Sequence, residues 1–479
     1  MPLILGTNSI KDTGYDVANS LRFNSGDSPY LTRTISSGAD VTQFTFSFWC
    51  KRSKLGGDQR IYSNQVTTAK EIYIRFNNNN TFTVYHQAGG SDVLSFDTNQ
   101  VFRDVSAWYH FHFVMDSTQS TESDRFKMHV NGVQVTDFNS PVYPSSSEAA
   151  AFLNTNEKSN IGYNDAGNNQ HFDGYLTEVV LLQGVAEPYT SFGEFDEDSP
   201  TIWKPKDVSS LSRGTNGFYL DFEDSSSLGN DQGGSVNLTP NNLAATDQST
   251  DTCTNNFATM NPLANSNSNV VLSEGNLFVS IQTSWLSTNS TIGVSKGKWY
   301  AEVKLITLGS IRFGIGKVGT TATATNTISQ TNNQASKSAD GYEINHSDGN
   351  KYNNNSNSSY GSAFSANDIG MIAFDADNGT LWFGKNGTWF NSATQSEIEN
   401  GTTTNSAYSG ISMTDYYLFT NSAETTGGGS VNGETSWNFG SPAYAISSGN
   451  SDSEGFGNFE YAVPSGYFAL CSKNLAEYG

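Results

Sequence analysis

Three acidic residues alternate along a short segment: Glu194, Asp196 and Asp198. In an extended strand such residues share a face, which would place their carboxyl groups roughly 5–10 Å apart, the range that glycoside hydrolysis requires. Ser199 and Pro200 follow directly, however, and the surrounding stretch is rich in turn residues. We therefore expect a solvated acidic loop, and we predict that the chain has no catalytic residues and is not an enzyme.

Two histidines also alternate, within an aromatic-rich run. If this run is a strand, His110 and His112 lie on the same side of it. A zinc site would need further nitrogen, sulfur or oxygen donors on that side, and the sequence alone assigns none. We expect packed or solvent-facing histidines, and the metal content stays unknown at this point. The motifs G-x-S-x-G and H-E-x-x-H and the P-loop do not occur.

Three tyrosines lie in a long polar stretch between residues 320 and 367 that is rich in Asn and Ser. Tyrosine combines apolar area with a hydroxyl group, and beside Asn and Ser it suits adaptable contacts of the kind that antibody loops make. Loops on a rigid β-scaffold commonly carry binding function. We predict that Tyr342, Tyr352 and Tyr360 contact a ligand; a surface loop without a ligand is the alternative.

The elements that would position these residues are strands, because apolar and polar residues alternate along most of the chain. Hairpin turns are indicated by Asn77–Asn80 and by Asn131-Gly132, the second in the pattern of a type I′ turn. We predict an all-β fold of two antiparallel β-sandwiches. The main expected strands are 45–50, 71–76, 81–85, 108–114, 125–130, 176–182, 277–281, 299–305, 311–316, 369–374, 380–383 and 416–419.

The composition fits this fold and excludes several functions. Aromatic residues make up 13% of the chain and charged residues 15%, whereas ordinary soluble domains contain about 25% charged residues. Asn, Ser, Thr and Gly, which favour turns, take the place of the missing charges. The net charge of −22 argues against nucleic-acid binding, which needs a basic surface, and against docking on an anionic membrane. We expect neither partner.

The cysteines and the apolar segments add little chemistry. Cys50, Cys253 and Cys471 are odd in number and far apart, so we expect three reduced, at least partly buried thiols rather than a disulfide framework. No apolar run approaches the ~20 residues of a transmembrane helix, so membrane insertion is not expected. The first residues indicate a strand rather than a signal peptide.

Four blocks in the second half of the chain resemble the SPRY domain in their order and spacing. They are residues 297–303 (GKWYAEV), 311–316 (IRFGIG), 368–375 (DIGMIAFD) and 379–387 (GTLWFGKNG). The resemblance implies a SPRY-like β-sandwich with a hairpin turn at the end of the last block. Equivalent loops bind peptide partners in cellular SPRY proteins, but no binding motif of that family transfers onto these positions.

The first 190 residues resemble the concanavalin A-like, laminin-G-type jelly roll. The similarity rests on residues 44–49 (FTFSFW), 108–111 (WYHF), 129–133 (HVNGV) and 172–178 (FDGYLTE). The resemblance implies a lectin-like sandwich. The same fold also includes glucanases, which is why the acidic segment described above needs to be weighed as a catalytic pair.

The laminin-G-type resemblance also raises calcium as a structural ion, because such jelly rolls often hold calcium at the rim of the sandwich through oxygen ligands. Asp124, Asp165 and Asp173 and the oxygen-rich stretch 221–231 are the candidates here. Turn chemistry explains each of these residues without a metal. We predict no other cofactor.

The segment between the two sandwiches indicates a biological setting. Residues 216–222, 247–251 and 255–257 resemble the connector that joins these two domain types in structural proteins of marine bacteriophages. We predict the following organisation: a jelly roll over 1–190, a structured connector over 191–265, a SPRY-like sandwich over 266–441 and an aromatic-rich tail over 442–479.

The phage resemblance implies a virion surface or tail-fibre protein that contacts other virion proteins and recognises a host-surface glycan or receptor. It also implies a homotrimer, although the chain has no coiled-coil heptads. Two alternatives stay open: a decoration or connector protein of the virion without a host ligand, and a polysaccharide-degrading glycoside hydrolase. The tail aromatics Phe456, Phe459, Tyr461, Tyr467 and Phe468 are expected either in an assembly contact or packed onto their own domain.

Overall fold

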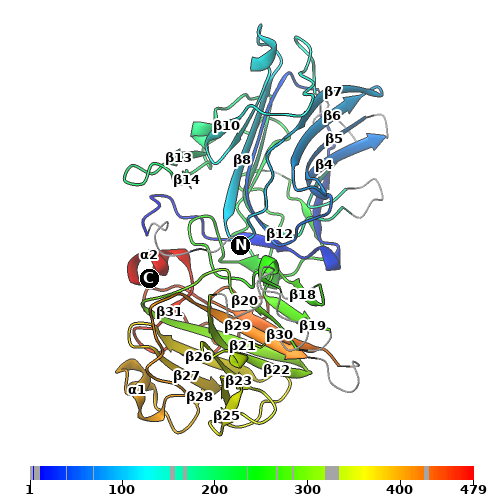
Figure 1. The fold of residues 1–479 in the computed structure, drawn as a ribbon. Coiled ribbons are helices and arrows are strands. Elements are labelled where there is room, and N and C mark those ends of the chain that lie inside the picture. Colours follow the sequence, from blue (N-terminus) through cyan, green and yellow to red (C-terminus); the bar gives the residue numbers. More distant parts are fainter. Residues whose placement is uncertain are drawn as a thin grey trace. The chain divides into compact units, whose positions relative to one another are not determined.

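The computed structural model shows a chain built almost entirely of antiparallel strands (Figure 1). It describes residues 4, 11–38, 40–67, 70–150, 157–164, 170–234, 236–265, 268–282, 285–318, 334–424 and 431–479. Two compact units are present, each with its own core. The first unit spans residues 13–254, and the second unit comprises residues 1–12 and 255–479. The predicted all-β fold is confirmed.

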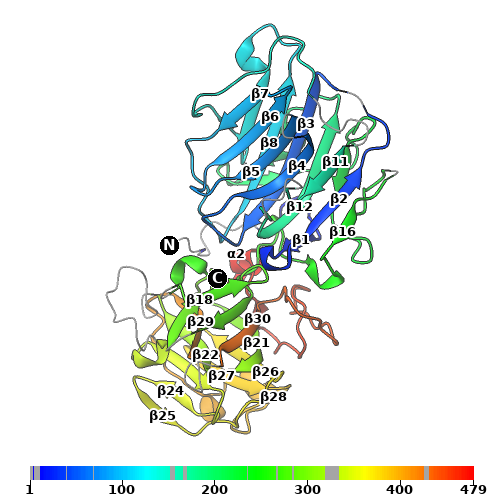
Figure 2. The same ribbon diagram turned by 90° about the vertical axis from the view of Figure 1, so that its right-hand side faces the viewer.

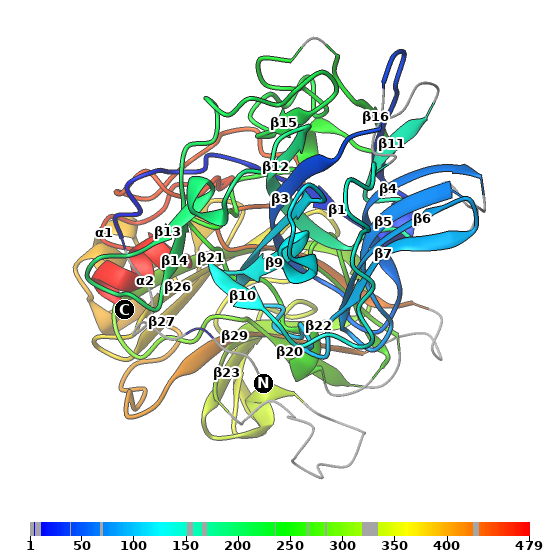
Figure 3. The same cartoon turned by 90° about the horizontal axis from the view of Figure 1, so that it is seen from above.

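Two antiparallel sheets form the first unit. One has the order β10 (Val133–Val135), β9 (Phe126–Val130), β8 (Trp108–Asp116), β3 (Gln43–Arg52), β12 (Gly174–Gln183), β1 (Ser20–Phe23) and β17 (Gln248–Ser249), with β15 (Phe218–Leu220) beside β12. The other has the order β16 (Thr239–Asn241), β2 (Tyr30–Thr34), β11 (Lys158–Ile161), β4 (Gln59–Thr67), β5 (Lys70–Phe76), β6 (Phe82–Ala88) and β7 (Ser91–Asp97). Figure 2 shows β4 to β7 side by side, and Figure 3 shows them in one layer with β3 and β9 in the other.

Aromatic side chains fill the space between these two sheets. On β3, Phe46 and Phe48 are separated by one small polar residue, so one face of the strand is aromatic. The ring of Phe48 stacks on Phe111 of β8 with 5.3 Å between centroids, and Phe82 of β6 stacks on Phe111 at 4.4 Å. Because β6 belongs to the opposite sheet, this stack joins the two layers. Each fully buried ring of this kind contributes about 1.5–3 kcal/mol.

The segment expected as a connector is largely part of the first unit. Strand β15 pairs with β12, β16 with β2 and β17 with β1. The carboxylate of Asp251 lies 2.7 Å from Nζ of Lys51, and both side chains are buried. Trp108 Nε1 donates a hydrogen bond of 3.1 Å to the other oxygen of this carboxylate. The predicted connector 191–265 is therefore divided between the units: residues 191–254 belong to the first, because these short strands and this ion pair complete its sandwich, and residues 255–265 belong to the second.

The second unit also contains two sheets. The larger has the order β18 (Val270–Ser273), β19 (Phe278–Ile281), β30 (Gly433–Asn438), β21 (Lys298–Leu308), β26 (Ile369–Asp375), β27 (Thr380–Lys385) and β28 (Thr388–Trp389), with β31 (Phe468–Ala469) beside β21. The smaller has the order β20 (Leu286–Asn289), β29 (Tyr417–Glu424), β22 (Ser310–Lys317), β23 (Gly341–Asn345), β24 (Lys351–Asn353) and β25 (Ser356–Ser358). The turn expected at the end of the last SPRY-like block joins β27 and β28.

The C-terminal tail packs onto its own unit, which was one of its two expected roles. The ring of Phe459 meets Tyr300 of β21 edge-on at 5.0 Å, and Tyr467 is fully buried in the same cluster. Helix α2 (Ser472–Tyr478) ends with a tyrosine whose ring stacks on Phe468 at 3.8 Å. These three tail aromatics are therefore engaged within the chain.

The three cysteines, all of them among the described residues, are free thiols. Cys50 and Cys471 are buried and Cys253 is partly buried, as expected. Burial raises the pKa of the Cys471 thiol to about 12, which keeps it protonated and unreactive at neutral pH. Among the described residues we find no helix long and apolar enough to span a membrane.

Candidate functional site

The acidic segment expected as a loop forms a turn beside a short hairpin of β13 (Gly193–Phe195) and β14 (Trp203–Pro205). Asp196 accepts a hydrogen bond of 2.8 Å from the backbone N–H of Ser199 and lies 3.2 Å from Nζ of Lys204. The backbone hydrogen bond from Ser199 lowers the pKa of Asp196. This carboxylate therefore holds the turn in its ionised form, whereas a general acid needs a raised pKa.

Three histidines, not two, cluster on the outer face of the eight-stranded sheet. His110 and His112 share a face of β8 as expected, and both are fully buried. The register of β8 and β9 places His129 directly opposite His112, and its exposed fraction is only 6%. The expectation of packed histidines is confirmed, but His129 could be found only by knowing which strand pairs with β8.

Hydrogen bonds show that this histidine cluster is neutral. Trp203 Nε1 donates to Nδ1 of His110 at 3.0 Å, so Nδ1 carries no proton. Nε2 of His112 lies 3.0 Å from the carbonyl oxygen of Glu187, to which it donates, and its Nδ1 lies 3.3 Å from Nδ1 of His129. Burial lowers the pKa of His112 to about 3 and that of His129 to about 4.

The aspartates proposed as calcium ligands are engaged in other contacts. Asp173 accepts hydrogen bonds from the backbone N–H and the hydroxyl of Ser25, at 3.1 and 2.6 Å. The carboxylate of Asp124 lies 2.9 Å from Nζ of Lys127. Asp165 lies outside the described residues. The two described carboxylates thus serve turn and ion-pair contacts.

The oxygen-rich stretch 221–231 is likewise occupied by turn contacts. Its carboxylates accept hydrogen bonds from backbone N–H groups: Asp221 from Glu223, Asp224 from Ser226 and Asp231 from Tyr219. No group of three or more His, Cys, Asp or Glu in the described ranges is arranged to hold a metal ion. The described acidic residues therefore form no carboxylate cluster, and structural calcium bound through backbone and amide oxygens stays a prediction.

The polar stretch between residues 320 and 367 is in part a folded piece of sheet. Residues 319–333 lie outside the described residues, but β23, β24 and β25 follow and extend the six-stranded sheet as consecutive antiparallel strands. The stretch is therefore more than a surface loop, because the alternation of Gly341–Asn345 buries one side of β23 in the core.

The three tyrosines of this stretch differ in exposure. Tyr360 is 6% exposed and meets Phe383 edge-on within the second core, so the expectation that it is a surface residue is wrong. Tyr342 is partly buried beside other tyrosines. Tyr352 is half-buried, and the guanidinium of Arg312 lies 3.7 Å from its ring centroid. A binding role for Tyr342 and Tyr352 stays a prediction.

A polar depression of about 370 Å³ lies on the outward face of strands β4 to β7. We call this region the polar face. It is lined by Asp58, Tyr73, Arg75, Asn77, Asn78, Asn79, Thr83, Tyr85, Ser95 and Asp97. Several of these residues were expected on strands, but none was predicted to be part of a site.

Strand register assembles the polar face from alternating residues. On β5, Tyr73 and Arg75 alternate with buried aliphatic and aromatic residues, so both point away from the core. Register places Tyr85 of β6 opposite Tyr73, and Thr83 opposite Arg75. Asp97 of β7 lies opposite Thr83. One row across the sheet is therefore aromatic, and the neighbouring row is polar and charged.

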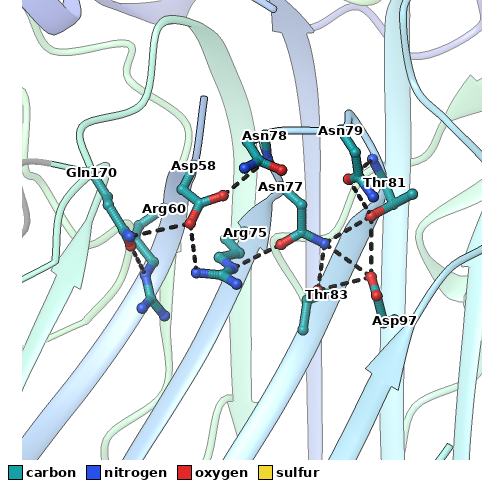
Figure 4. Close-up of polar contacts among 10 residues, drawn as sticks. All are labelled: Asp58, Arg60, Arg75, Asn77, Asn78, Asn79, Thr81, Thr83, Asp97 and Gln170. Carbon is teal, nitrogen blue, oxygen red and sulfur yellow. Dashed lines mark hydrogen bonds and ion pairs between the residues drawn. The ribbon is translucent and has the colours of Figure 1, made fainter. Parts of the chain in front are cut away.

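A hydrogen-bond network fixes the polar row (Figure 4). Oδ1 of Asp97 accepts a hydrogen bond from Nδ2 of Asn77 at 2.9 Å and from the hydroxyls of Thr81 and Thr83 at 3.1 Å each. Arg75 Nε donates to Oδ1 of Asn77 at 2.8 Å. Because each group is held by at least one neighbour, the row is rigid before any ligand arrives.

Asp58 anchors the other end of this network. Its Oδ2 lies 3.0 Å from Nη1 of Arg75, and its Oδ1 accepts the backbone N–H of Asn78 at 2.9 Å. Gln170 contacts both Asp58 and Arg60 at the start of β4, since its Nε2 donates to Asp58 at 3.3 Å and its Oε1 accepts from Arg60 Nε at 2.7 Å (Figure 4). The turn of four asparagines is thereby tied to the sheet.

The aromatic row is held between cations. The guanidinium carbon of Arg60 lies 3.6 Å from the ring centroid of Tyr73, and that of Arg75 lies 5.0 Å away. The rings of Tyr73 and Tyr85 are 4.8 Å apart at 30°. The hydroxyl of Tyr85 donates to Asp92 at 2.6 Å. These contacts hold both rings on the outward face while leaving them partly exposed.

Some polar atoms of the polar face are not used by the protein. Within the part of the chain that the structure describes, Oδ2 of Asp97 accepts no hydrogen bond, and Nδ2 of Asn79 donates none. A free acceptor and a free donor therefore lie beside two partly exposed tyrosines. The arrangement can bind a ligand that carries both hydroxyl groups and an apolar side.

The chain is a two-sandwich β protein, and its polar face is an open, preformed surface of the kind that binds ligands. Residues 24–188 match the family model of the concanavalin A-like lectin/glucanases superfamily, and residues 298–403 match that of the SPRY domain. The chain therefore carries one domain of each kind, which confirms both resemblances at the level of the domain.

Three of the solved structures that the chain resembles are the following. The SPRY domain of human HERC1 is 12% identical over 37% of this chain and 96% of its own, with a TM-score of 0.28. A protein described as carbohydrate-binding, from Bacteroides ovatus, is 15% identical over 47% and 59%, with a TM-score of 0.33. The heptameric SAP-like pentraxin of Limulus polyphemus is 14% identical over 36% and 80%, with a TM-score of 0.26. A comparison with curated proteins found no significant match.

Proposed function

We propose that the first unit binds a glycan on the polar face. The observation that carries this proposal is the row of Tyr73 and Tyr85 beside the free carboxylate oxygen of Asp97. A sugar ring has an apolar side that can pack on a tyrosine ring, and hydroxyl groups that can donate to a carboxylate and accept from an amide. Pockets of about 300–1,000 Å³ with a few fixed polar groups are typical of such sites.

We further propose that the glycan is bound and not cleaved. A glycosidase needs a carboxyl group of raised pKa beside the scissile bond. Burial raises the pKa of Glu178 to about 8 and that of Glu302 to about 6, but both side chains are almost fully buried and neither lines the polar face. Incubation with polysaccharide should therefore release no new reducing ends, and sustained release would overturn this part of the proposal.

The biological setting that we propose is the surface or tail fibre of a bacteriophage virion, where the glycan would belong to the host. This part is supported by the connector resemblance in residues 216–222, 247–251 and 255–257 and by the pairing of the two domain types. A trimer within the virion is proposed on the same ground. Immunogold labelling of particles with an antibody against the chain, together with a host-cell binding assay, separates an adhesin from a connector protein.

Replacing Tyr73 tests the site itself. We expect Tyr73→Ala to weaken binding to the preferred glycan of an array about tenfold or more, because buried aromatic contacts dominate such interfaces. Tyr352→Ala is the matched control, since its ring also packs under an arginine at 3.7 Å but lies in the second unit. If Tyr352→Ala abolishes binding and Tyr73→Ala does not, the ligand site lies in the SPRY-like domain.

A further inference from the structure

A second polar pocket lies at the rim of the first unit and shares no lining residue with the polar face. Its volume is about 480 Å³. It is formed by residues 33–36 at the end of β2, residues 211–217, and residues 231, 233, 234 and 236. Two arginines, Arg33 and Arg213, and one carboxylate, Asp231, line it. We call it the arginine pocket.

The charges of the arginine pocket do not balance. Nη1 of Arg33 lies 3.8 Å from Oδ2 of Asp231, and Arg213 also interacts electrostatically with this carboxylate. The other carboxylate oxygen accepts the backbone N–H of Tyr219 at 3.0 Å. One carboxylate cannot neutralise two guanidinium groups, so the pocket keeps one surplus positive charge in a chain whose net charge is −22.

Both arginines also have a buried donor without a partner. Nε of Arg33 and Nε of Arg213 are buried, and neither donates a hydrogen bond to any residue in the described ranges. The rest of each guanidinium is held in place: Arg33 donates to the carbonyls of Asn216 and Val236, and Arg213 donates to that of Ser209 at 3.1 Å. An unpaired buried donor on a charged group is costly, and such a donor is normally satisfied by a protein group or by ordered water. The two Nε atoms therefore show that the protein does not fully pair either guanidinium group.

The backbone around the arginine pocket is preformed. Gly214 has φ +70°, and a Cβ there would lie 2.0 Å from the carbonyl oxygen of Gln183, so only glycine lets this loop lie against β12. The N–H of Gln183 in turn donates to the carbonyl of Arg213 at 3.0 Å. At Gly234 a Cβ would lie 1.9 Å from the Asp231 carboxylate. Little ordering is therefore needed when a ligand binds.

From these observations we infer that the arginine pocket binds the single oxyanion group of an acidic sugar, either a carboxylate or a sulfate ester. Both groups carry one negative charge, which matches the surplus charge, and both present oxygen acceptors to guanidinium donors. Phosphate monoesters, with a charge near −2, match less well. Hydroxyl groups of Ser36, Ser212 and Thr215 line the remaining wall and suit the neutral part of a sugar. The inference does not depend on the polar face.

Calorimetric titration of the full chain with glucuronate, glucose 6-sulfate and glucose tests this inference. We expect at least one of the two anionic sugars to bind about tenfold or more tightly than glucose, and the comparison between them identifies the preferred group. Arg213→Gln should weaken that binding about tenfold or more. Arg103→Gln removes the same charge from an exposed position outside the pocket and should leave binding within about twofold.

A second pocket variant should change the affinity for the anionic sugar in the opposite direction from Arg213→Gln. Asp231→Asn keeps an oxygen acceptor for the N–H of Tyr219 but removes the competing carboxylate, so it should tighten binding of the anionic sugar several-fold. Loss of stability would not produce a tighter complex. The inference is overturned if neither anionic sugar binds better than glucose, or if Arg213→Gln and Arg103→Gln behave alike. Tyr73→Ala leaves this binding unchanged, so failure here and failure of the polar face are separable.

Discussion

A fragment of residues 13–254 should fold as a stable unit, whereas a fragment of residues 13–190 should remain unfolded in dilute buffer. The shorter fragment lacks five side chains of the first core: Phe218, Leu220, Phe222, Leu228 and Leu238. Burial of each contributes about 1.5–3 kcal/mol, so their loss removes about 7–15 kcal/mol. This is as large as the whole stability of a typical domain, about 5–15 kcal/mol. Circular dichroism and urea unfolding of the two fragments measure the difference.

Removal of the segment after residue 190 also leaves a buried charge without its partner. Nζ of Lys51 is 2.7 Å from Asp251, and breaking a buried ion pair by removing one partner costs about 3–5 kcal/mol. Asp251→Ala in the 13–254 fragment is the matched control and should reduce stability by that amount without abolishing folding. Cooperative unfolding of the 13–190 fragment would instead show that residues 191–254 are an appendage to the jelly roll.

The strands of both sandwiches could be predicted from the sequence, but the strands that complete the first unit could not. On β3, polar and apolar residues alternate from Gln43 to Phe48, and on β8 they alternate from Tyr109 to Phe113, which is long enough for the period of two to be recognised. Strands β15, β16 and β17 contain only two or three residues each. They pair with β12, β2 and β1, and such distant pairings leave no local pattern.

The candidate site depends even more on contacts between residues that are distant in the sequence, which no local pattern reveals. The turn at Asn77–Asn80 was predicted, but nothing near it shows that Asn77 donates to Asp97, two strands away in the sheet. Tyr73 and Arg75 alternate with core residues and could have been placed on an outward face from the period alone. Conversely, the polar neighbours of Tyr360 suggested exposure, although its ring packs in the second core.

Acid should unfold the first unit at a milder pH than the second unit. Five of the six histidines lie in the first unit, and all five are held in the neutral form by burial. The pKa is lowered to about 4 for His86 and His129 and to about 3 for His112, mainly because desolvation disfavours the charged ring. An unfolded chain restores the ordinary value of about 6.5.

The sign of the effect follows from these pKa values. The unfolded chain takes up protons as the pH falls through about 6.5, whereas the folded histidines do so only near pH 4. Their stabilising effect is therefore complete above pH 6.5 and is lost as the pH falls toward 4, by at most about 1.4 kcal/mol per histidine and pH unit. Glu178 acts in the opposite direction, because its pKa is raised to about 8 and its contribution is lost as the pH rises from about 4.5 toward that value. Burial also raises the pKa of Asp173, Glu223, Asp231 and Asp247, so these carboxyl groups act in the same direction as Glu178.

Urea unfolding of the 13–254 fragment at pH 7.0, 6.0 and 5.0 should give a steep fall in the free energy of unfolding. His129→Gln should reduce this slope by at most about 1.4 kcal/mol per pH unit, because one titrating ring is removed. His171→Gln is a milder comparison, since its pKa is also lowered but it lies outside the cluster. An unchanged slope in His129→Gln would contradict the neutral cluster.

Protonation of His110 should first affect the β13–β14 hairpin. A proton on Nδ1 of His110 would face the N–H donor of Trp203, so their hydrogen bond would be lost and the hairpin should detach. The fluorescence of Trp203 should therefore change before the sheet unfolds.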